Sequence, residues 1–425
     1  MMDRLTPPGY MTRIADREVG RALRASPAVL IEGPRACGKT WTGRRHASSE
    51  VPFDSVFEHR LTAQIAPEQV LEGAVPRLLD EWQLAPDVWN AMRRACDDRG
   101  RKGQFILTGS ADPPDDTTRH TGTGRIIRVQ MKPMSLFESG DSNNHVSLGE
   151  LLVSGCVSAS VPPLDLPDLV DLACRGGWPG LLNDPPNIAQ RQLRAYLDEI
   201  SRTDISRVDG ITRDPAGVRR LLASLGRNVS TQVTLKTLGA DVSGSDETLH
   251  PQTVKSYLSA LSRLFVVEDL PAWRPHLRSR AELRRTPKRY FVDPSLAVAA
   301  LRSNRNRLMN ELSYFGLLFE SLVLRDLSIY ARANDWELSH YRDNSGLEVD
   351  IILTSLDHNK WAAAEVKLGG THLIEQGVES LRHLRDRVDT KRMGEPSKLM
   401  VITAGGYSFE HPDGVAVVPI TVLGP

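Results

Sequence analysis

The sequence predicts an α/β protein with an N-terminal parallel-sheet domain, a mainly helical middle region and a C-terminal α/β domain. In residues 10–135, short apolar runs such as PAVLIEG and FILTGS alternate with helical stretches, a pattern typical of a parallel sheet. Residues 169–305 carry apolar residues at three- and four-residue spacing, which predicts helices. From residue 308 a long helix precedes three strand candidates, a helix and further strands. We therefore expect domains at 1–140, 141–305 and 306–425.

Each expected element rests on a short stretch of sequence. In the first domain, apolar runs place strands at 27–33, 56–61, 75–81 and 103–110, with a helix-compatible stretch at 40–49. In the middle region, apolar spacing places helices at 190–205, 217–230, 234–242 and 250–270. In the last domain, a helix at 315–332 precedes strand candidates at 336–343, 347–354 and 360–369, a helix at 373–388 and strand candidates at 398–405 and 415–421.

Composition limits the classes of protein that need to be considered. The 425 residues are 40% hydrophobic and 25% charged, which excludes disorder of the whole chain. Lys plus Arg and Asp plus Glu each number 53, so any contact with nucleic acid must come from a local patch. No apolar run approaches the roughly 18–20 residues of a membrane span. The four cysteines form no CxxC pair, and we expect a cytoplasmic protein without a membrane partner.

The first candidate site is a glycine-rich motif between a predicted strand and a predicted helix. The pattern G-x-x-x-x-G-K-T, followed by Trp41, is formed by Gly33, Pro34, Arg35, Ala36, Cys37, Gly38, Lys39 and Thr40. It predicts a loop whose backbone N–H groups surround the phosphates of ATP. Lys39 would reach the β- and γ-phosphates, and Thr40 would place its hydroxyl on Mg²⁺. The alternative is a chance glycine-rich turn.

Further candidates follow the next strands of this domain. Asp80 and Glu81 end a predicted strand, where Asp80 would hold Mg²⁺ through water and Glu81 would deprotonate the attacking water. Thr108 and Ser110 end another strand and would lie near the γ-phosphate. Arg125 is a candidate catalytic arginine, acting within one chain or between subunits. The alternatives are a surface acidic pair, ordinary strand-end hydroxyls and an arginine on a solvated loop.

At this point a family resemblance is plain. The segments GPRACGKT, LLDEWQLAPDVWNAMR, FILTGS and GRIIRVQMKPMSLFE resemble the AAA+-type ATPases of the bacterial and archaeal family that carries the C-terminal domain DUF4143. The segments GGWPG, AYLDEISRTDI and PKRYFVDPSL resemble the same family. The resemblance implies ATP binding and hydrolysis, and, since AAA+ relatives commonly form rings, a homo-oligomer. It does not imply a substrate.

The middle region contains a candidate DNA-binding segment. The stretches 234–242 and 250–270 predict a helix–turn–helix of winged-helix type, with polar Gln252, Thr253, Lys255 and Ser256 at the start of the second helix. The following stretch, Arg274–Arg289, has seven Lys or Arg residues against one Glu. Such a patch suits a phosphate backbone, so DNA is an expected partner. The alternatives are a solvated surface and a protein contact.

The second candidate site is a set of acidic residues beside a lysine in the last domain. Residues two apart share one face of a strand, so Glu365 and Lys367 project together, as do Glu348 and Asp350. If the two strands pair, Asp350 approaches Glu365 and Lys367, while Val349, Ile351 and Leu353 face the core. Glu320 on the preceding helix would complete the cluster. Carboxylate oxygens suit Mg²⁺ or Mn²⁺, and Lys367 would stabilise the developing charge.

This arrangement looks like the PD-(D/E)xK nuclease superfamily, although Val349 replaces the proline before Asp350. The resemblance implies a metal-dependent nuclease with Glu320, Asp350 and Glu365 as ligands. Two functions therefore remain open. One is an ATP-driven DNA-processing enzyme with a nuclease, conceivably exonuclease, domain. The other is an ATP-dependent switch or assembly protein whose C-terminal domain only binds DNA or a partner.

Overall fold

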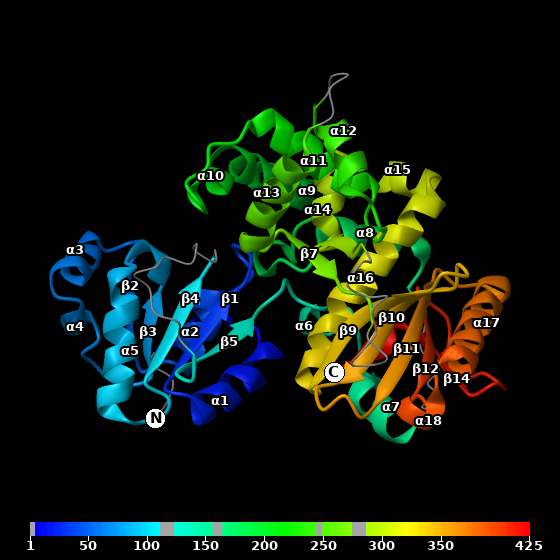
Figure 1. The fold of residues 1–425 in the computed structure, drawn as a ribbon, viewed down its shortest axis with the longest axis horizontal. Coiled ribbons are helices and arrows are strands. Elements are labelled where there is room, and N and C mark those ends of the chain that lie inside the picture. Colours follow the sequence, from blue (N-terminus) through cyan, green and yellow to red (C-terminus); the bar gives the residue numbers. More distant parts are fainter. Residues whose placement is uncertain (1–4, 111–122, 156–163, 244–248, 274–285) are drawn as a thin grey trace. The chain divides into compact units, whose positions relative to one another are not determined.

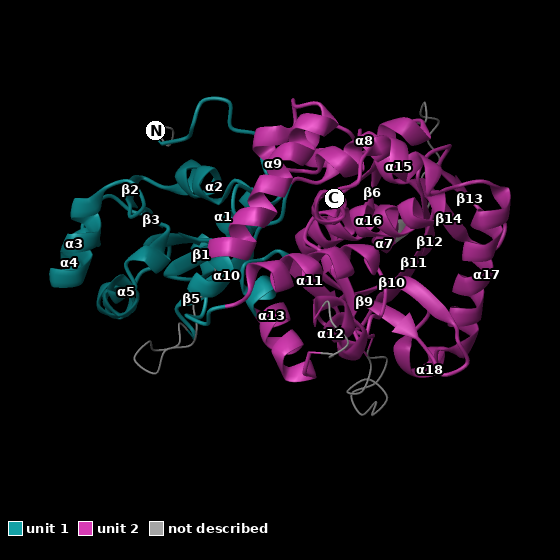
Figure 2. Ribbon diagram, turned by 90° about the horizontal axis from the view of Figure 1, so that it is seen from above, with its two compact units in different colours: residues 1–133, 204–212, 260–266 teal, residues 134–203, 213–259, 267–425 magenta. Residues whose placement is uncertain are grey.

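The computed structural model describes residues 5–110, 123–155, 164–243, 249–273 and 286–425 (Figure 1). The chain divides into two compact units (Figure 2). Unit 1 comprises Met1–Pro133, Asp204–Thr212 and Ala260–Val266, and unit 2 comprises Met134–Thr203, Arg213–Ser259 and Val267–Pro425. Within the described ranges, no helix combines the length and apolar character needed to cross a membrane.

Unit 1 is built around a five-stranded parallel sheet in the order β2-β3-β4-β1-β5. The strands are β1 (Ala28–Glu32), β2 (Ser49–Pro52), β3 (Arg77–Asp80), β4 (Phe105–Gly109) and β5 (Ile126–Gln130). The helices are α1 (Ala15–Ala25), α2 (Lys39–His46), α3 (Phe57–Ile65), α4 (Pro67–Val70), α5 (Asp87–Arg99) and α10 (Ile205–Arg207), with a 3₁₀ turn at Trp82–Leu84. Because β4 lies between β1 and β3, the C-terminal ends of these three strands lie side by side.

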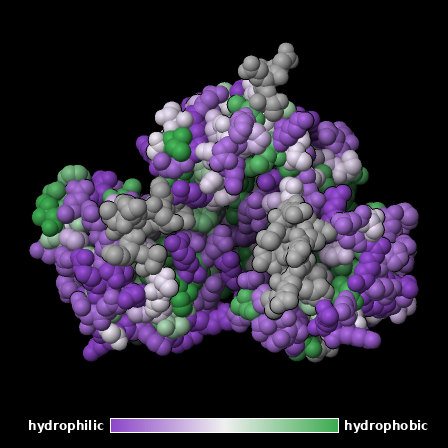
Figure 3. Space-filling model, viewed as in Figure 1, coloured by the Kyte–Doolittle hydropathy of each residue, from purple (hydrophilic) through white to green (hydrophobic). Residues whose placement is uncertain are grey.

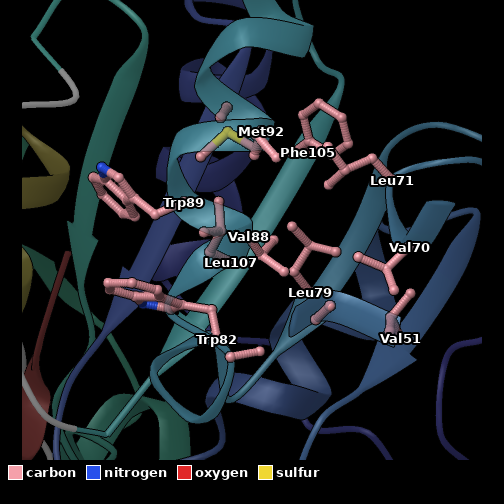
Figure 4. Packing of buried hydrophobic residues seen from close by; sticks show 14 of the residues in the cluster. Val51, Val70, Leu71, Leu79, Trp82, Val88, Trp89, Met92, Phe105 and Leu107 are labelled. Atoms are coloured by element: carbon pink, nitrogen blue, oxygen red, sulfur yellow. The ribbon is translucent and has the colours of Figure 1, made fainter. Parts of the chain in front are cut away.

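Alternate residues of each strand pack on opposite faces of this sheet, as the pleat requires. One face carries Leu30, Leu79 and Leu107, which pack with Trp89 and Met92 of α5 (Figure 4). The other face carries Val29, Leu78 and Ile106, which pack with Val19 and Ala22 of α1. The sheet is therefore buried between helices on both sides, and the predicted parallel α/β domain is confirmed.

In unit 1, one predicted strand is wrong, and two strands, β2 and β5, were not predicted. Residues 56–61 were expected to be a strand, but Phe57–Ile65 form helix α3. Its apolar residues Phe57, Leu61 and Ile65 recur every four residues, which is the helical period and not the alternation of a strand. They are 63%, 44% and 76% exposed, and an apolar area is visible where Figure 1 places α3 (Figure 3). Strand β2 has only four residues and carries a weak apolar signal.

The N-terminal part of unit 2 is mainly helical, as predicted. Its elements are α6 (Leu136–Ser139), β6 (Val146–Ser147), α7 (Leu148–Ser154), α8 (Leu166–Arg175), a 3₁₀ turn (Pro179–Leu181), α9 (Pro186–Glu199), α11 (Pro215–Arg227), α12 (Leu235–Ser243), β7 (Val267–Leu270), β8 (Lys288–Phe291), α14 (Pro294–Ala300) and α15 (Arg305–Asn310). Helix α13 (Pro251–Arg263) and a π-helical turn (Ile200–Asp204) run across the boundary between the units. Strands β7 and β8 form an antiparallel pair after α12 and α13, which is the element order of a winged helix.

The C-terminal part of unit 2 is a six-stranded mixed sheet in the order β13-β14-β12-β11-β10-β9. Its elements are α16 (Leu312–Ala333), β9 (Trp336–Arg342), β10 (Glu348–Ser355), β11 (Trp361–Lys367), α17 (Thr371–Arg387), α18 (Thr390–Met393), β12 (Leu399–Thr403), β13 (Phe409–Glu410) and β14 (Val415–Pro419). A 3₁₀ turn (Ile420–Val422) precedes β15 (Leu423–Gly424), which pairs with β6. Strands β9, β10 and β11 are antiparallel, and β11, β12 and β14 are parallel. The predicted order of helices and strands is confirmed, but the mixed sheet does not establish a nuclease fold.

The predicted alternation of side chains between the two faces of β10 is interrupted next to Asp350. Val349, Ile351 and Leu353 were expected on one face, but Val349 shares its hydrophobic cluster with Ile352. The pairing of β10 with β9 shifts register between Val349 and Ile352, which is a β-bulge. A bulge adds a residue and changes the face on which the following side chains lie. The bulge therefore includes Asp350, the central acidic residue of the second candidate site.

Candidate functional site

The predicted phosphate-binding loop joins the C-terminal end of β1 to the N-terminus of α2. Gly38 has φ +103°, a conformation that side chains disfavour. A Cβ atom on Gly33 would lie 2.2 Å from the backbone oxygen of Met131, so this position has no room for a side chain. The remaining loop residues are Pro34, Arg35, Ala36 and Cys37, and Trp41 on α2 is 43% exposed. The two glycines are thus required by backbone geometry.

Two buried cations fix the shape of the loop. Lys39 Nζ donates a hydrogen bond to the Pro34 carbonyl at 2.7 Å. Arg13 donates from Nη1 to the Cys37 carbonyl at 2.6 Å and from Nη2 to the Lys132 carbonyl at 2.8 Å. The role of Arg13 was not predicted, because it depends on a contact between residues 24 positions apart in the chain. A phosphate bound at this loop would accept the hydrogen bond of the Lys39 ammonium in place of the Pro34 carbonyl.

Asp80 lies beside Thr40, and these are the two residues of this domain that were predicted to hold Mg²⁺. Asp80 Oδ1 accepts hydrogen bonds from the Thr40 hydroxyl at 2.8 Å and from the Thr108 hydroxyl at 2.5 Å. Burial raises the pKa of Asp80, and the two hydroxyl donors oppose that shift. A hydroxyl beside a carboxylate is an oxygen donor set that fits Mg²⁺. Thr40 and Asp80 are therefore the residues that would hold the ion.

Glu81 is held by partners from the 3₁₀ turn that follows it and from the C-terminal end of β4. Its carboxylate accepts hydrogen bonds from the Gln83 amide and from Ser110 Oγ, the latter at 3.1 Å. Its backbone N–H donates to Thr108 Oγ1 at 3.1 Å, and its φ is +55°, which is uncommon for a residue other than glycine. Backbone strain of this kind clusters at functional sites. Gln83 was not predicted, although its place two residues after Glu81 could have suggested it.

Arg35, inside the loop, is paired with a residue far along the chain. Its Nη1 donates to Asp204 Oδ2 at 2.6 Å. Asp204 is 4% exposed and ends the π-helical turn Ile200–Asp204, and such turns are frequent at functional sites. The sequence indicated Arg35 as a loop residue but gave no sign of its partner.

Arg125 lies at the wrong edge of the sheet for a role within its own chain. Strand β5 pairs in parallel with β1, with Ile126 opposite Ala28, so Arg125 precedes the N-terminal end of its strand. The phosphate-binding loop follows the opposite, C-terminal end of β1. The Arg125 side chain is exposed and bonded to Asp97 at 2.6 Å. This position does not favour the predicted catalytic role within one chain, and it leaves the two other readings, a role between chains and an arginine on a solvated loop.

In the C-terminal sheet, the predicted acidic residues do converge. Asp350 Oδ2 accepts a hydrogen bond from the Val366 backbone N–H at 2.9 Å and lies 3.9 Å from Lys367 Nζ. Lys367 Nζ donates to Glu365 Oε2 at 2.5 Å. The antiparallel pairing of β10 and β11 produces these contacts, as the sequence analysis expected.

A second lysine occupies the centre of this cluster. Lys288 of β8 is 2% exposed. Its Nζ lies 2.9 Å from Glu348, 3.1 Å from Glu320 and 3.3 Å from Asp350, while Tyr290 on the same face of β8 donates to Glu320 at 2.7 Å. From the sequence, Lys288 was expected to belong to a basic surface patch. The alternation of Lys288 and Tyr290 along a strand could have indicated one shared face.

The predicted metal site at Glu320, Asp350 and Glu365 does not fit this geometry. Their oxygens are directed at the ammonium groups of Lys288 and Lys367. Across the described residues, no group of three or more His, Cys, Asp or Glu side chains is arranged to hold a metal ion. The physical reason is that a fixed ammonium already supplies the positive charge that a divalent ion would bring.

The protonation of the cluster follows from burial and charge together. Burial and the neighbouring Asp350 raise the pKa of Glu320 to about 7, although Lys288 opposes the shift. Burial also raises the pKa of Glu365. For Asp350, Lys288 and Lys367 outweigh the effect of burial and lower the pKa. For Lys288, the surrounding carboxylates outweigh burial and raise the pKa, so this lysine stays charged.

The predicted DNA-binding stretch Arg274–Arg289 is described only from residue 286. Of its seven basic residues, Arg274, Arg278, Arg280, Arg284 and Arg285 lie outside the described residues. Lys288 and Arg289 are buried and bonded inside unit 2, Arg289 to the Val233 carbonyl at 2.7 Å. These two side chains are therefore not available to a phosphate backbone. In α13, Gln252, Thr253 and Lys255 are exposed, as a recognition helix would require.

Comparison with known protein families assigns the first of these sites to a class. The AAA domain family matches residues 25–139, which contain the sheet and the loop of unit 1. Residues 315–423 match the domain of unknown function DUF4143, and residues 166–307 match another domain of unknown function, DUF8612. The chain thus carries an AAA-type ATPase-like domain followed by two domains whose roles are not defined.

Similar proteins include two uncharacterised mycobacterial proteins, one from Mycobacterium bovis and one from Mycobacterium tuberculosis. Each is 25% identical over 411 residues, covering 96% of this chain and 83% of the relative. Among solved structures, a Walker-type ATPase of Pyrococcus abyssi is similar with a TM-score of 0.42 and 13% identity, over 70% of this chain and 97% of that one. The replication initiator DnaA, bound to AMPPCP and single-stranded DNA, is similar with a TM-score of 0.29 and 13% identity, over 61% and 93%.

Proposed function

We propose that this protein is an ATP-dependent molecular switch that binds and hydrolyses ATP with Mg²⁺ at the loop of unit 1. The observation that carries the proposal is the grouping of Lys39, Thr40, Asp80 and Glu81 at the C-terminal edge of one parallel sheet. Ligands bind at this edge in open α/β sheets. The magnesium ion would neutralise phosphate charge, and the backbone N–H groups at the start of α2 would hold the phosphates.

The side chains around Glu81 support its role as general base. A base must be held within hydrogen-bonding reach of the water that it deprotonates. Ser110 and Gln83 bond one oxygen of the Glu81 carboxylate, which leaves the other available for a water molecule. Lys39 would stabilise the charge that develops on the transferred phosphoryl group.

The contact between Arg35 and Asp204 gives the proposed switch a mechanism. A guanidinium inside the phosphate-binding loop is within reach of a nucleotide's phosphates, which compete with Asp204 for it. ATP would therefore weaken the Arg35–Asp204 pair, and release of phosphate would restore it. Asp204 ends the π-helical turn Ile200–Asp204, which follows helix α9. Making or breaking the Arg35–Asp204 ion pair would therefore couple the nucleotide bound at the loop to the conformation of this turn.

The geometry of the C-terminal cluster favours the switch over the nuclease. A two-carboxylate nuclease site needs an open position for a divalent ion and its water. Lys288 fills that position, with three carboxylates within 3.3 Å of its Nζ. We therefore propose that the C-terminal domain binds DNA or a partner protein and does not cut phosphodiester bonds. Assembly into a homo-oligomer is part of the same proposal.

Two variants test the ATP site separately. Lys39→Ala should abolish ATP hydrolysis and weaken ATP binding, because the phosphates lose their cation. Glu81→Gln should keep ATP binding but reduce hydrolysis by about 10²–10⁴-fold, the usual contribution of a general base. Phosphate release and equilibrium ATP binding are the measurements. Undiminished turnover in either variant would reject the assigned site.

The nuclease alternative has its own test. Labelled single- and double-stranded DNA is incubated with the wild-type protein, Mg²⁺ or Mn²⁺, and ATP. We expect no cleavage above that of Asp350→Ala. Cleavage that is lost in Asp350→Ala would show that the cluster opens in solution and would restore the nuclease function.

A further inference from the structure

The helical part of unit 2 contains a cavity lined by arginines. Helix α14 packs against both α9 and α11 (Figure 1), and the cavity between them has a volume of about 380 Å³. Its charged lining comes from Arg194 and Asp198 of α9, Arg219 and Arg220 of α11, and Arg302 after α14. A volume of this size is near the lower end of small-molecule sites, which span roughly 300–1,000 Å³.

The positive charge of this cavity is not balanced by the protein. Arg219 lies 3.8 Å from Asp198 and Arg220 lies 3.5 Å from Asp214, both long for ion pairs. The four guanidinium groups thus face two carboxylates. The strongest hydrogen bonds of Arg194 and Arg220 are to the backbone carbonyls of Ser303 and Val242, at 3.0 Å and 2.5 Å, which carry no net charge.

Two of these arginines have donor groups that the protein leaves unpaired. Within the part of the chain that the structure describes, Arg194 Nε is buried and has no hydrogen-bond partner. Arg302 lines the cavity, is exposed, follows the last turn of α14 and has φ +50°. An unusual backbone angle of this kind persists only where the surroundings hold it.

The rest of the lining is apolar and made of alanines and leucines. It consists of Leu197, Ala216, Leu222, Ala223, Ala299 and Ala300. Arginines pair with phosphates through several N–H donors at once, and an apolar lining can pack against a ring. A ligand that satisfies both parts carries phosphate groups and a planar ring.

We propose that this cavity is a second nucleotide site, which takes either a free nucleotide or one nucleotide unit of a nucleic-acid strand. The site lies in the region that matches DUF8612 and is separate from the phosphate-binding loop of unit 1. It gives the helical region a ligand of its own. The proposal does not depend on ATP hydrolysis at unit 1.

The test uses the full chain with Lys39→Ala, so that the loop of unit 1 contributes little binding. The probes are ATP and a fluorescein-labelled single-stranded DNA. Arg219→Ala/Arg302→Ala removes two guanidinium groups from the cavity, and Arg191→Ala/Lys236→Ala removes two charges from exposed positions outside it. Ala223→Phe fills the floor without changing the charge, and thermal unfolding verifies that each variant folds.

We expect the arginine variant to lose at least tenfold in affinity for one probe, the control to stay near the parent, and Ala223→Phe to reproduce the loss. Loss for ATP alone identifies a free nucleotide as the ligand. Loss for the oligonucleotide, with a shallower salt dependence, identifies a strand. If neither probe binds the parent, or if the arginine variant and its control are weakened equally, the proposal is overturned.

Discussion

Lys288→Met is the substitution that most directly tests the proposed role of the C-terminal cluster. Methionine keeps the length of the side chain but removes an ammonium that has three carboxylates within 3.3 Å. Removing one partner of a buried ion pair costs about 3–5 kcal/mol, since the remaining charges stay buried. Glu348 is 37% exposed and contributes less than the other two. We expect a loss of about 3–5 kcal/mol in the free energy of unfolding at pH 8.

The loss should depend on pH in a defined direction. The pKa of Glu320 is already raised from 4.5 to about 7, and loss of the Lys288 charge raises it further. Between pH 4.5 and the raised pKa of Glu320, the folded variant binds a proton that the unfolded chain has released. The free energy of unfolding of the variant therefore falls as the pH rises through this range. The difference between variant and wild type should therefore be small near pH 5 and largest at pH 8.

Urea unfolding followed by tryptophan fluorescence measures this effect. Trp273 and Trp361 lie 5.2 Å apart in the same hydrophobic cluster and report on the C-terminal sheet. Lys360→Met, at an exposed turn of that sheet, is the matched control and should change stability by less than about 0.5 kcal/mol. Mn²⁺ should stabilise Lys288→Met and leave the wild type unchanged. A loss below about 1 kcal/mol at pH 8 would refute the assignment of Lys288 as the internal cation.

Three further substitutions probe the ATP site. Gly33→Ala should abolish ATP binding, because the new Cβ would lie 2.2 Å from the Met131 oxygen and displace the loop; unchanged affinity in a calorimetric titration would contradict this. Arg125→Ala should leave the rate of hydrolysis within about twofold of wild type, since the residue lies at the opposite sheet edge; lost turnover with retained ATP binding would instead place it against a second copy. Asp204→Asn should raise ATP affinity by up to tenfold, because Arg35 loses a competing carboxylate, and an unchanged affinity would argue against the switch.

Much of unit 1 follows from short stretches of sequence. The phosphate-binding loop is a local feature, because eight consecutive residues specify its glycines, its lysine and its hydroxyl. The strands that carry Asp80 and Ser110 are apolar runs with polar residues at their ends, which is visible without coordinates. The prediction of a strand at residues 56–61 was wrong because a six-residue window is too short to separate a strand from the first turns of an amphipathic helix.

The contacts between distant residues could not be obtained in this way. Arg13 holds the loop across 24 residues, and Arg35 reaches Asp204 across 169. Neither pairing leaves a pattern in the local sequence. The bulge at Asp350 likewise depends on the register with β9, which alternation alone does not reveal.

By itself, the sequence determined that this protein carries an ATPase-like phosphate-binding loop on a parallel sheet and that acidic residues of its last domain gather beside Lys367. Only the tertiary structure decided which charged groups those acidic residues contact. Lys288 is 32 residues from Glu320 and 62 from Asp350 in the chain, yet its ammonium lies between them. Chain order records which charges are present, whereas the packing of β8 against the C-terminal sheet sets which charges meet.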